Sequence, residues 1–160
     1  MTPKLLVPFD DSPPAAAALE HALARFADEE ITVLYVIDAD EPDGSLRQRL
    51  LTEAFEERRR TGKRTADRVL EGARRYAAGY GVEIATLTAF GRPARRIVEH
   101  AEGNGIDRIV MGTHGRSGLS RLLLGSISEA VSQGSSVAVT TVREAGGFEE
   151  FSRQDVAHTA

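Results

Sequence analysis

Short apolar segments alternate with longer stretches of helical periodicity along most of the chain. The segments Lys4–Val7 and Ile31–Ile37 are continuously apolar or rich in β-branched residues, which is typical of buried parallel strands. Between them, Ala16, Leu19 and Leu23 recur at spacings of three and four, which predicts a helix. Each strand is therefore expected to lead through a loop into a helix and then back to the next strand.

Five strands and four helices can be placed on the sequence in this way. Their alternation predicts an α/β fold with helices on both faces of a five-stranded parallel sheet, and the doubly wound, Rossmann-like strand order 3-2-1-4-5 fits it. Residues 1–143 form this domain, and residues 144–160 are expected to be a loosely held tail. The expected strands are Lys4–Val7, Ile31–Ile37, Val82–Thr88, Asp107–Met111 and Ser135–Val142. The first three expected helices run from the Ser12 cap to Phe26, from Leu46 to Ala78 and from Gly91 to Gly103. The fourth helix is expected to follow the glycine-rich loop that begins at Gly112 and to end at about Gly134.

A glycine-rich loop follows the fourth strand. Its spacing is Gly112-x2-Gly115-x9-Gly125-Ser126, and it connects the carboxyl end of a strand to the amino end of a helix. Glycine lets backbone N–H groups approach a phosphate, and the helix terminus adds unpaired donors. The Walker A pattern and the dinucleotide pattern Gly-x-Gly-x2-Gly are both absent. The alternative is a tight loop whose glycines serve turn geometry alone.

The glycine spacing resembles that of the nucleotide-binding branch of the universal stress protein family, and the resemblance extends from about Lys4 to Val142. The resemblance implies an adenine nucleotide as the ligand, namely ATP, alone or with Mg²⁺. It also implies a role as a nucleotide-dependent regulator or sensor in a stress response. The residues expected to cradle the phosphates are Gly112, Gly115, Gly125 and Ser126.

A second candidate loop, Pro8–Ser12, follows the first strand. In the order 3-2-1-4-5 the first and fourth strands are neighbours, so this loop and the glycine loop face the same crevice. The resemblance implies that Asp10 binds the nucleotide, and a carboxylate suits ribose hydroxyls or a phosphate-bound Mg²⁺. The alternative is that Asp10 or Asp11 only caps the first helix.

The end of the second strand supplies a further candidate. The resemblance implies that the backbone of Val36 recognises adenine, although an apolar residue at this place is also ordinary core. The remaining residues predicted to bind the cofactor are neighbours of these loops, namely Pro8, Phe9, Met111, Thr113, His114, Arg116 and Ile127.

The composition argues against several classes of function. The formal net charge is −4, which argues against a general nucleic-acid-binding protein. The chain has no cysteine, and so no disulfide framework, catalytic thiolate or zinc–cysteine site. No apolar run approaches the roughly 20 residues of a membrane span, and no signal peptide is visible. We therefore expect a cytoplasmic protein that does not bind membranes.

Nucleotide binding is better supported by the sequence than catalysis. Hydrolysis of ATP needs a positioned water and strong charge stabilisation, and the sequence offers no catalytic lysine and no dedicated base. A slow ATP hydrolase that uses His114 or Asp10 stays open as an alternative. An interaction module of the same fold that uses no nucleotide also stays open, although family members of that kind lack the glycine motif.

The fifth strand is expected to form a homodimer. The segment Val137 to Val142 would lie at an edge of the sheet, and it is uncharged and free of proline, so it is open to pairing with another strand. A two-fold pairing of this edge in two chains closes it, and the family resemblance implies the same. The alternative is a monomer in which the tail, with Phe148 and Phe151, folds back over this edge.

Overall fold

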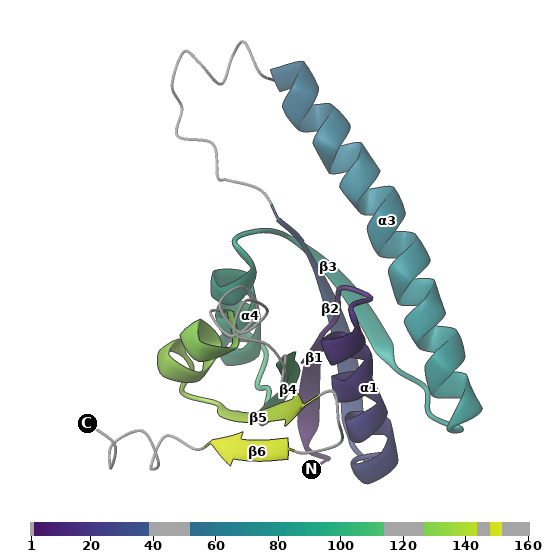
Figure 1. Ribbon diagram of the computed structural model, residues 1–160, viewed down its shortest axis with the longest axis vertical. Coiled ribbons are helices and arrows are strands. Elements are labelled where there is room, and N and C mark those ends of the chain that lie inside the picture. Colours follow the sequence, from purple (N-terminus) through teal and green to yellow (C-terminus); the bar gives the residue numbers. More distant parts are fainter. Residues whose placement is uncertain (1, 39–51, 114–126, 144–147, 152–160) are drawn as a thin grey trace.

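Five parallel strands form the centre of the computed structural model, which describes residues 2–38, 52–113, 127–143 and 148–151 (Figure 1). They lie in the order β3-β2-β1-β4-β5, which confirms the predicted topology. The parallel strands are β1 (Lys4–Pro8), β2 (Glu30–Asp38), β3 (Ala85–Gly91), β4 (Arg108–Thr113) and β5 (Ala138–Arg143).

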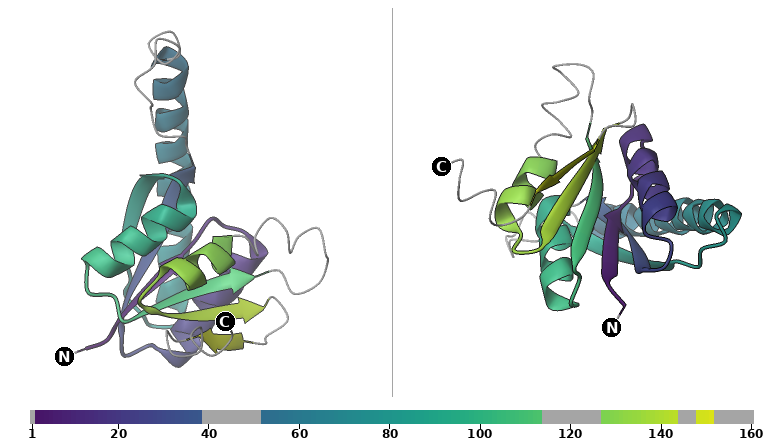
Figure 2. Two further views of the ribbon diagram at one scale, coloured as in Figure 1. Left: turned by 90° about the vertical axis from the view of Figure 1, so that its left-hand side faces the viewer. Right: turned by 90° about the horizontal axis from the view of Figure 1, so that it is seen from below.

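Helices cover both faces of the sheet. Helices α1 (Pro13–Arg25) and α3 (Thr52–Gly79) lie on one face, and α4 (Pro93–Gly103) and the helical residues 127–134 lie on the other (Figure 2). Each face has its own cluster of buried apolar side chains, as expected for a doubly wound sheet. None of the described helices is long and apolar enough to cross a membrane.

The first loop and helix follow the prediction closely. The Ser12 hydroxyl caps α1 by accepting a hydrogen bond from the backbone N–H of Ala15 at 3.3 Å. Pro13 and Pro14 occupy the first turn, where a missing N–H costs no helical hydrogen bond. The helix ends at Arg25, and Phe26 forms its C-cap.

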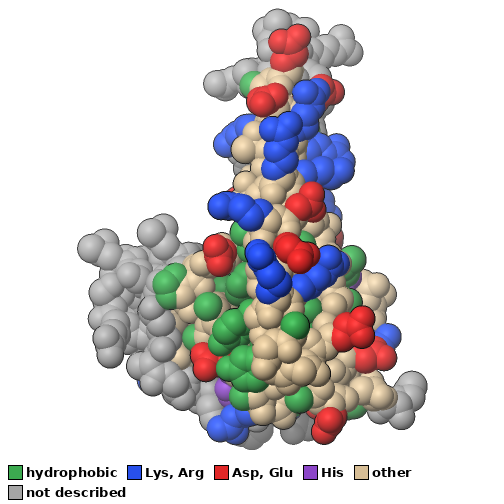
Figure 3. Space-filling model, turned by 90° about the vertical axis from the view of Figure 1, so that its right-hand side faces the viewer, with side chains coloured by type: hydrophobic (Ala, Val, Ile, Leu, Met, Phe, Trp, Pro, Cys, Tyr) green, Lys and Arg blue, Asp and Glu red, His purple; other side chains and the backbone are tan. Residues whose placement is uncertain are grey.

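Helix α3 has 28 residues, which corresponds to about 42 Å, but only its second half is buried on the sheet. The first half extends past the carboxyl ends of β2 and β3, and its exposed side carries basic and acidic side chains (Figures 1 and 3). The predicted start of this helix at Leu46 lies outside the described residues. The buried positions recur at helical spacing and are Ala66, Val69, Leu70, Ala73 and Ala77.

The third strand begins later than predicted. Alternation in the sequence indicated Val82–Thr88, whereas β3 starts at Ala85 and ends at Gly91. Gly81 has a φ of 73°, so the chain turns there, and Ile84 is buried before the pairing with β2 begins. The predicted start of this strand is wrong because the pattern of apolar residues indicates which side chains are buried. It does not indicate where the hydrogen bonds to the neighbouring strand begin. The fifth strand likewise starts at Ala138 and not at Ser135.

The outer side of β5 is not an open edge. Strand β6 (Phe148–Phe151) pairs antiparallel with β5, from Val139 opposite Phe151 to Val142 opposite Phe148. The expectation of an unpaired edge along Val137 to Val142 is therefore wrong for the single chain. The physical reason is that a nearby segment of the same chain satisfies the outward N–H and C=O groups of β5, at a low cost in loop closure.

Candidate functional site

A pocket of about 300 Å³ opens at the carboxyl ends of β1, β2 and β4. It lies where the strand order reverses, which is the place where doubly wound sheets bind ligands. Of the residues predicted to bind the cofactor, the pocket brings together Pro8, Phe9, Asp10, Val36, Met111, Gly112 and Ile127.

The other predicted residues are not part of the described pocket lining. Thr113 ends β4 and is absent from the described lining. The remainder of the glycine motif and its neighbours lie outside the described residues, namely His114, Gly115, Arg116, Gly125 and Ser126.

The pocket exists because β1 is short and parts from β4. The described pairing of β1 with β4 is limited to Leu5 with Arg108 and Leu6 with Ile109. On its other side, β1 pairs with β2 as far as Pro8 opposite Leu34, and β2 then continues for four more residues to Asp38. The end of β2 therefore contributes to the pocket, and none of the described strands lies beside it on the β1 side.

The backbone of β2 presents polar groups to this pocket. The carbonyl oxygen of Leu34 accepts a hydrogen bond from the backbone N–H of Phe9 at 2.8 Å. This bond lies at the end of the described pairing between β1 and β2. In a parallel strand the N–H and C=O of one residue point to the same neighbour, and successive residues alternate. The N–H and C=O groups of Val36 and of Asp38 therefore point to the side of β1, beyond its end. A ligand in the pocket can form hydrogen bonds with these backbone groups in the way that a neighbouring strand would.

Gly112 is needed for packing as well as for a close approach to a ligand. A Cβ atom at this position would overlap the main chain of Pro14 in the first turn of α1. Main-chain atoms cannot rotate away as a side chain can, so α1 approaches β4 this closely only because residue 112 has no side chain. The same contact places the amino end of α1 against the pocket, where Pro14 and Ala15 are lining residues.

Asp10 holds the first loop and also lines the pocket. One carboxylate oxygen, Oδ1, accepts the backbone N–H of Ser12 at 3.0 Å and so holds the loop between β1 and α1. The side chain also lines the pocket, and the cap of α1 is supplied by Ser12 and not by Asp10. Asp11 follows with a φ of 65°, a left-handed conformation that Asp tolerates better than most residues.

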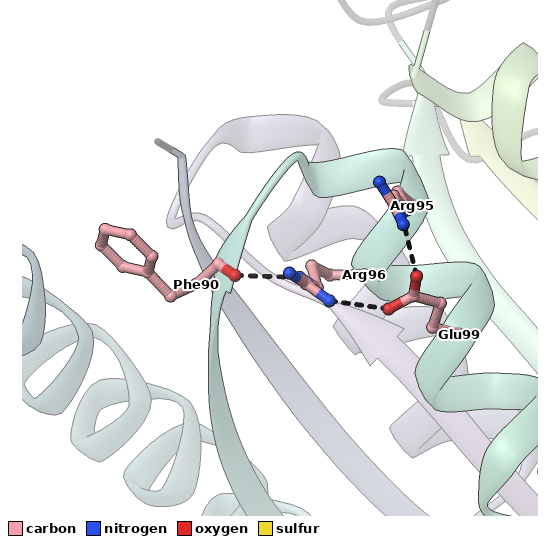
Figure 4. Close-up of polar contacts among 4 residues, drawn as sticks. All are labelled: Phe90, Arg95, Arg96 and Glu99. Atoms are coloured by element: carbon pink, nitrogen blue, oxygen red, sulfur yellow. Dashed lines mark hydrogen bonds and ion pairs between the residues drawn. The ribbon is translucent and has the colours of Figure 1, made fainter. Parts of the chain in front are cut away.

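Helix α4 also contributes to the pocket lining, and Arg96 ties the start of this helix to the end of β3 (Figure 4). Arg96 Nε donates to the Phe90 carbonyl oxygen at 2.9 Å, and its Nη1 pairs with Glu99 at 2.8 Å. Arg95 also donates to Glu99, at 2.9 Å, and the hydrogen bonds from Arg95 and Arg96 lower the pKa of that carboxyl. These contacts position the start of α4, from which Pro93 and Ile97 line the pocket.

The charge of the described lining is negative. Only Asp10 and Asp38 carry a charge among the described lining residues. Nowhere in the described part of the chain do three or more His, Cys, Asp or Glu side chains gather as a metal site would require. The described walls therefore suit an uncharged group with hydrogen-bond donors, and a phosphate would have to lie towards Gly112 and the loop that follows it.

Sequence reasoning missed several lining residues. Asp38 had a usable signal, because it directly follows the apolar run Ile31–Ile37, which was predicted as a strand. The residues from α4 had none, since their place at the pocket depends on the crossover of the chain. The lining residues that were not predicted are Ser12, Pro14, Ala15, Leu34, Tyr35, Asp38, Pro93 and Ile97.

Comparison with known proteins agrees with this fold. The universal stress protein YxiE of Bacillus subtilis is 39% identical over 145 residues, covering 88% of this chain and 98% of the relative. The universal stress protein MJ0577 of Methanocaldococcus jannaschii is 32% identical, and its solved structure gives a TM-score of 0.71 over 89% of this chain and 96% of that chain.

The fold is shared more widely than the sequence. A universal stress protein family protein of Arabidopsis thaliana, solved with AMP bound, gives a TM-score of 0.64 at 21% identity and covers 88% of this chain and 91% of that chain. Residues 1–143 match the model of the universal stress protein family. With that match over most of its length and relatives above 30% identity along nearly their whole sequences, this chain belongs to the universal stress protein family.

Proposed function

We propose that this stress-response protein binds ATP in the pocket at the carboxyl ends of β1, β2 and β4 and acts as a nucleotide-dependent regulator or sensor. The observation that carries the proposal is the end of β2, which pairs with β3 but runs past the end of β1, so that the N–H and C=O groups of Val36 and Asp38 on the β1 side face the pocket. The AMP bound to the Arabidopsis relative is in keeping with it.

The described walls fit an adenosine group. Adenine offers a donor, its 6-amino group, beside an acceptor, N1, and the end of β2 offers a C=O beside an N–H. Three apolar residues, Val36, Ile97 and Met111, also line the pocket and suit the faces of the base. The ribose then lies near the end of β1, where the free oxygen of Asp10 can accept a hydroxyl.

The phosphates belong on the β4 side of the pocket. Gly112 lines the pocket there without a side chain, and the glycine motif continues from it. A Mg²⁺ ion bound with the phosphates would neutralise part of their charge, and Asp10 would be its protein ligand in place of the ribose contact. Binding without rapid turnover fits the described lining, whose only charged side chains are two carboxylates. The cytoplasmic location stays a prediction from the sequence.

Thermal unfolding with and without ATP and Mg²⁺ tests the proposal. Millimolar ATP should raise the melting temperature of the unaltered protein, because a ligand that binds only the folded state stabilises it. Gly115→Val and Gly125→Val should remove the shift. Gly72→Ala, at a helical glycine with open space around it, is the matched control and should keep it. The absence of any shift in the unaltered protein would reject ATP binding.

A homodimer through Val137 to Val142 requires β6 to leave its place on β5, because both would use the same edge. We therefore propose that this dimer forms only when β6 is detached or exchanged between chains. A chain ending at Arg143 should form a tighter dimer than the full chain in light scattering. A shortened chain that stays at the mass of a monomer would contradict this proposal.

A further inference from the structure

We propose that Asp38 selects the base of the bound nucleotide: its carboxylate accepts a hydrogen bond from the 6-amino group of adenine and excludes purines that carry a 6-oxo group. This inference rests on the proposed function, and it concerns which purine bases the nucleotide pocket accepts. Asp38 is the last residue of β2, pairs with Gly91 of β3, and lines the pocket.

The strand geometry places Asp38 beside the part of the pocket assigned to the base. Side chains alternate between the faces of a strand, so Asp38 shares a face with Leu34 and Val36. Those two residues pack in the cluster on the α4 side, and Ile97 belongs to the same cluster and also lines the pocket. The carboxylate and the Val36 carbonyl therefore border the same end of the pocket.

Asp38 is available for a ligand in a way that Asp10 is not. The Asp38 side chain is exposed, and it makes no hydrogen bond or ion pair within the part of the chain that the structure describes. Asp10 has one oxygen engaged with the Ser12 N–H and lies in the loop that follows β1. An ionised carboxylate can only accept hydrogen bonds, so Asp38 favours a donor at the edge of the base.

The 6-amino group of adenine supplies two N–H donors, and this end of the pocket supplies two acceptors for them, the Val36 carbonyl and the Asp38 carboxylate. A 6-oxo purine would place an acceptor oxygen against both. A site built on hydrogen bonds rejects an analogue that leaves its polar groups unpaired far more strongly than an apolar site does. The negative charge of the Asp38 carboxylate repels the 6-oxo oxygen more strongly than the Val36 carbonyl, which is neutral, would do alone.

Calorimetry with ATP and inosine triphosphate tests the inference, because the two nucleotides differ at position 6 of the base and at the adjoining N1 proton. The unaltered protein should bind ATP about tenfold to a hundredfold more tightly, which is the effect expected of one charged hydrogen bond. Asp38→Asn should lower this preference at least about tenfold, because the introduced amide accepts more weakly from the 6-amino group and can turn its NH₂ group towards a 6-oxo oxygen.

Two controls separate the possible outcomes. Glu30→Gln removes the same charge at the opposite end of β2 and should leave the preference unchanged. Asp10→Ala should weaken both nucleotides alike, since its place is near the ribose. An equal preference in the Asp38→Asn and unaltered proteins, or equal binding of the two nucleotides by the unaltered protein, would overturn the inference and leave ATP binding intact. Failure of the unaltered protein to bind either nucleotide would reject both proposals.

Discussion

Helices α1 and α3 lie on the same face of the sheet, but they contact it in different ways. Helix α1 buries residues from Pro14 in its first turn to Leu23 in its last, and its main chain touches β4 at Gly112. Helix α3 buries only its second half, and its first half extends beyond the sheet (Figure 1). The helix that borders the pocket is therefore held by buried side chains along most of its length and by a main-chain contact at its start, whereas the longer helix buries side chains in its second half alone.

The largest effect is expected where the main chains of α1 and β4 meet. Gly112→Ala would place a Cβ atom inside the Pro14 main chain, and α1 would have to move away from β4. We expect the free energy of unfolding to fall by about 3 kcal/mol, which is the upper part of the usual range for overpacking. Chemical denaturation measures this loss, and a variant as stable as the unaltered protein would show that α1 can shift freely.

Truncating one side chain in each helix sharpens the comparison. Leu19 in α1 is 1% exposed, and Leu19→Ala should cost about 3 kcal/mol of unfolding free energy. Phe55, in the extending half of α3, packs its ring against Phe90 at 5.4 Å between centroids, and Phe55→Ala should cost about 1 kcal/mol. Equal losses by chemical denaturation would mean that the first half of α3 is as tightly held as α1.

Two of the glycines in α3, Gly62 and Gly72, should respond in opposite directions to substitution by alanine. A Cβ at Gly62 would lie 2.5 Å from Cγ2 of Ile37, a stiff β-branched side chain, whereas a Cβ at Gly72 meets nothing within 4 Å. Gly62→Ala should therefore lower the free energy of unfolding by about 1 kcal/mol, despite the better helix propensity of alanine. Gly72→Ala should raise it by up to about 1 kcal/mol. Matched thermal melts compare the two, and a stabilising Gly62→Ala would contradict the close approach of α3 to β2.

The smallest effect concerns the polar link between the two helices. The Tyr80 hydroxyl donates to Glu20 of α1 at 3.4 Å and lies 3.4 Å from the Tyr76 hydroxyl. The hydrogen bond with Tyr80, followed by partial burial and the charge of Glu20, raises the pKa of Tyr76 to about 12. Because this folded-state pKa exceeds the ordinary value of 10.0, the contribution to stability is complete below pH 10 and is lost as the pH rises towards 12.

A titration of tyrosinate absorbance tests this assignment. Tyr80→Phe should lower the pKa of Tyr76 towards 10.0, and Glu20→Gln should lower it less, because the charge of Glu20 is a smaller cause than the hydrogen bond. Stability at neutral pH should hardly change in either variant, since Tyr76 and Tyr80 are both substantially exposed. An unchanged titration in Tyr80→Phe would mean that the two hydroxyls do not interact in solution.

The part of the pocket that follows β1 could be read from the sequence because its signals are local. A polar loop directly after an apolar strand indicated Asp10, and a serine before two prolines indicated the cap of α1. The strand order then brought this loop and Gly112 to one crevice. The same reasoning placed β3 too early, because alternating burial begins before the hydrogen-bonded ladder does.

Four features could be predicted from the sequence alone: the order of the elements, their apolar faces, the cap of α1 and the two loops that meet at the pocket. Each of these features depends on residues that lie a few positions apart in the chain. Only the tertiary structure decided how far β2 runs past β1, and hence which backbone groups of Val36 and Asp38 face the pocket. It alone decided that Gly112 touches Pro14 and that β6 covers β5. The physical reason is that these features depend on register and close approach between segments far apart in the chain, where several pairings satisfy the same apolar pattern and packing selects one of them.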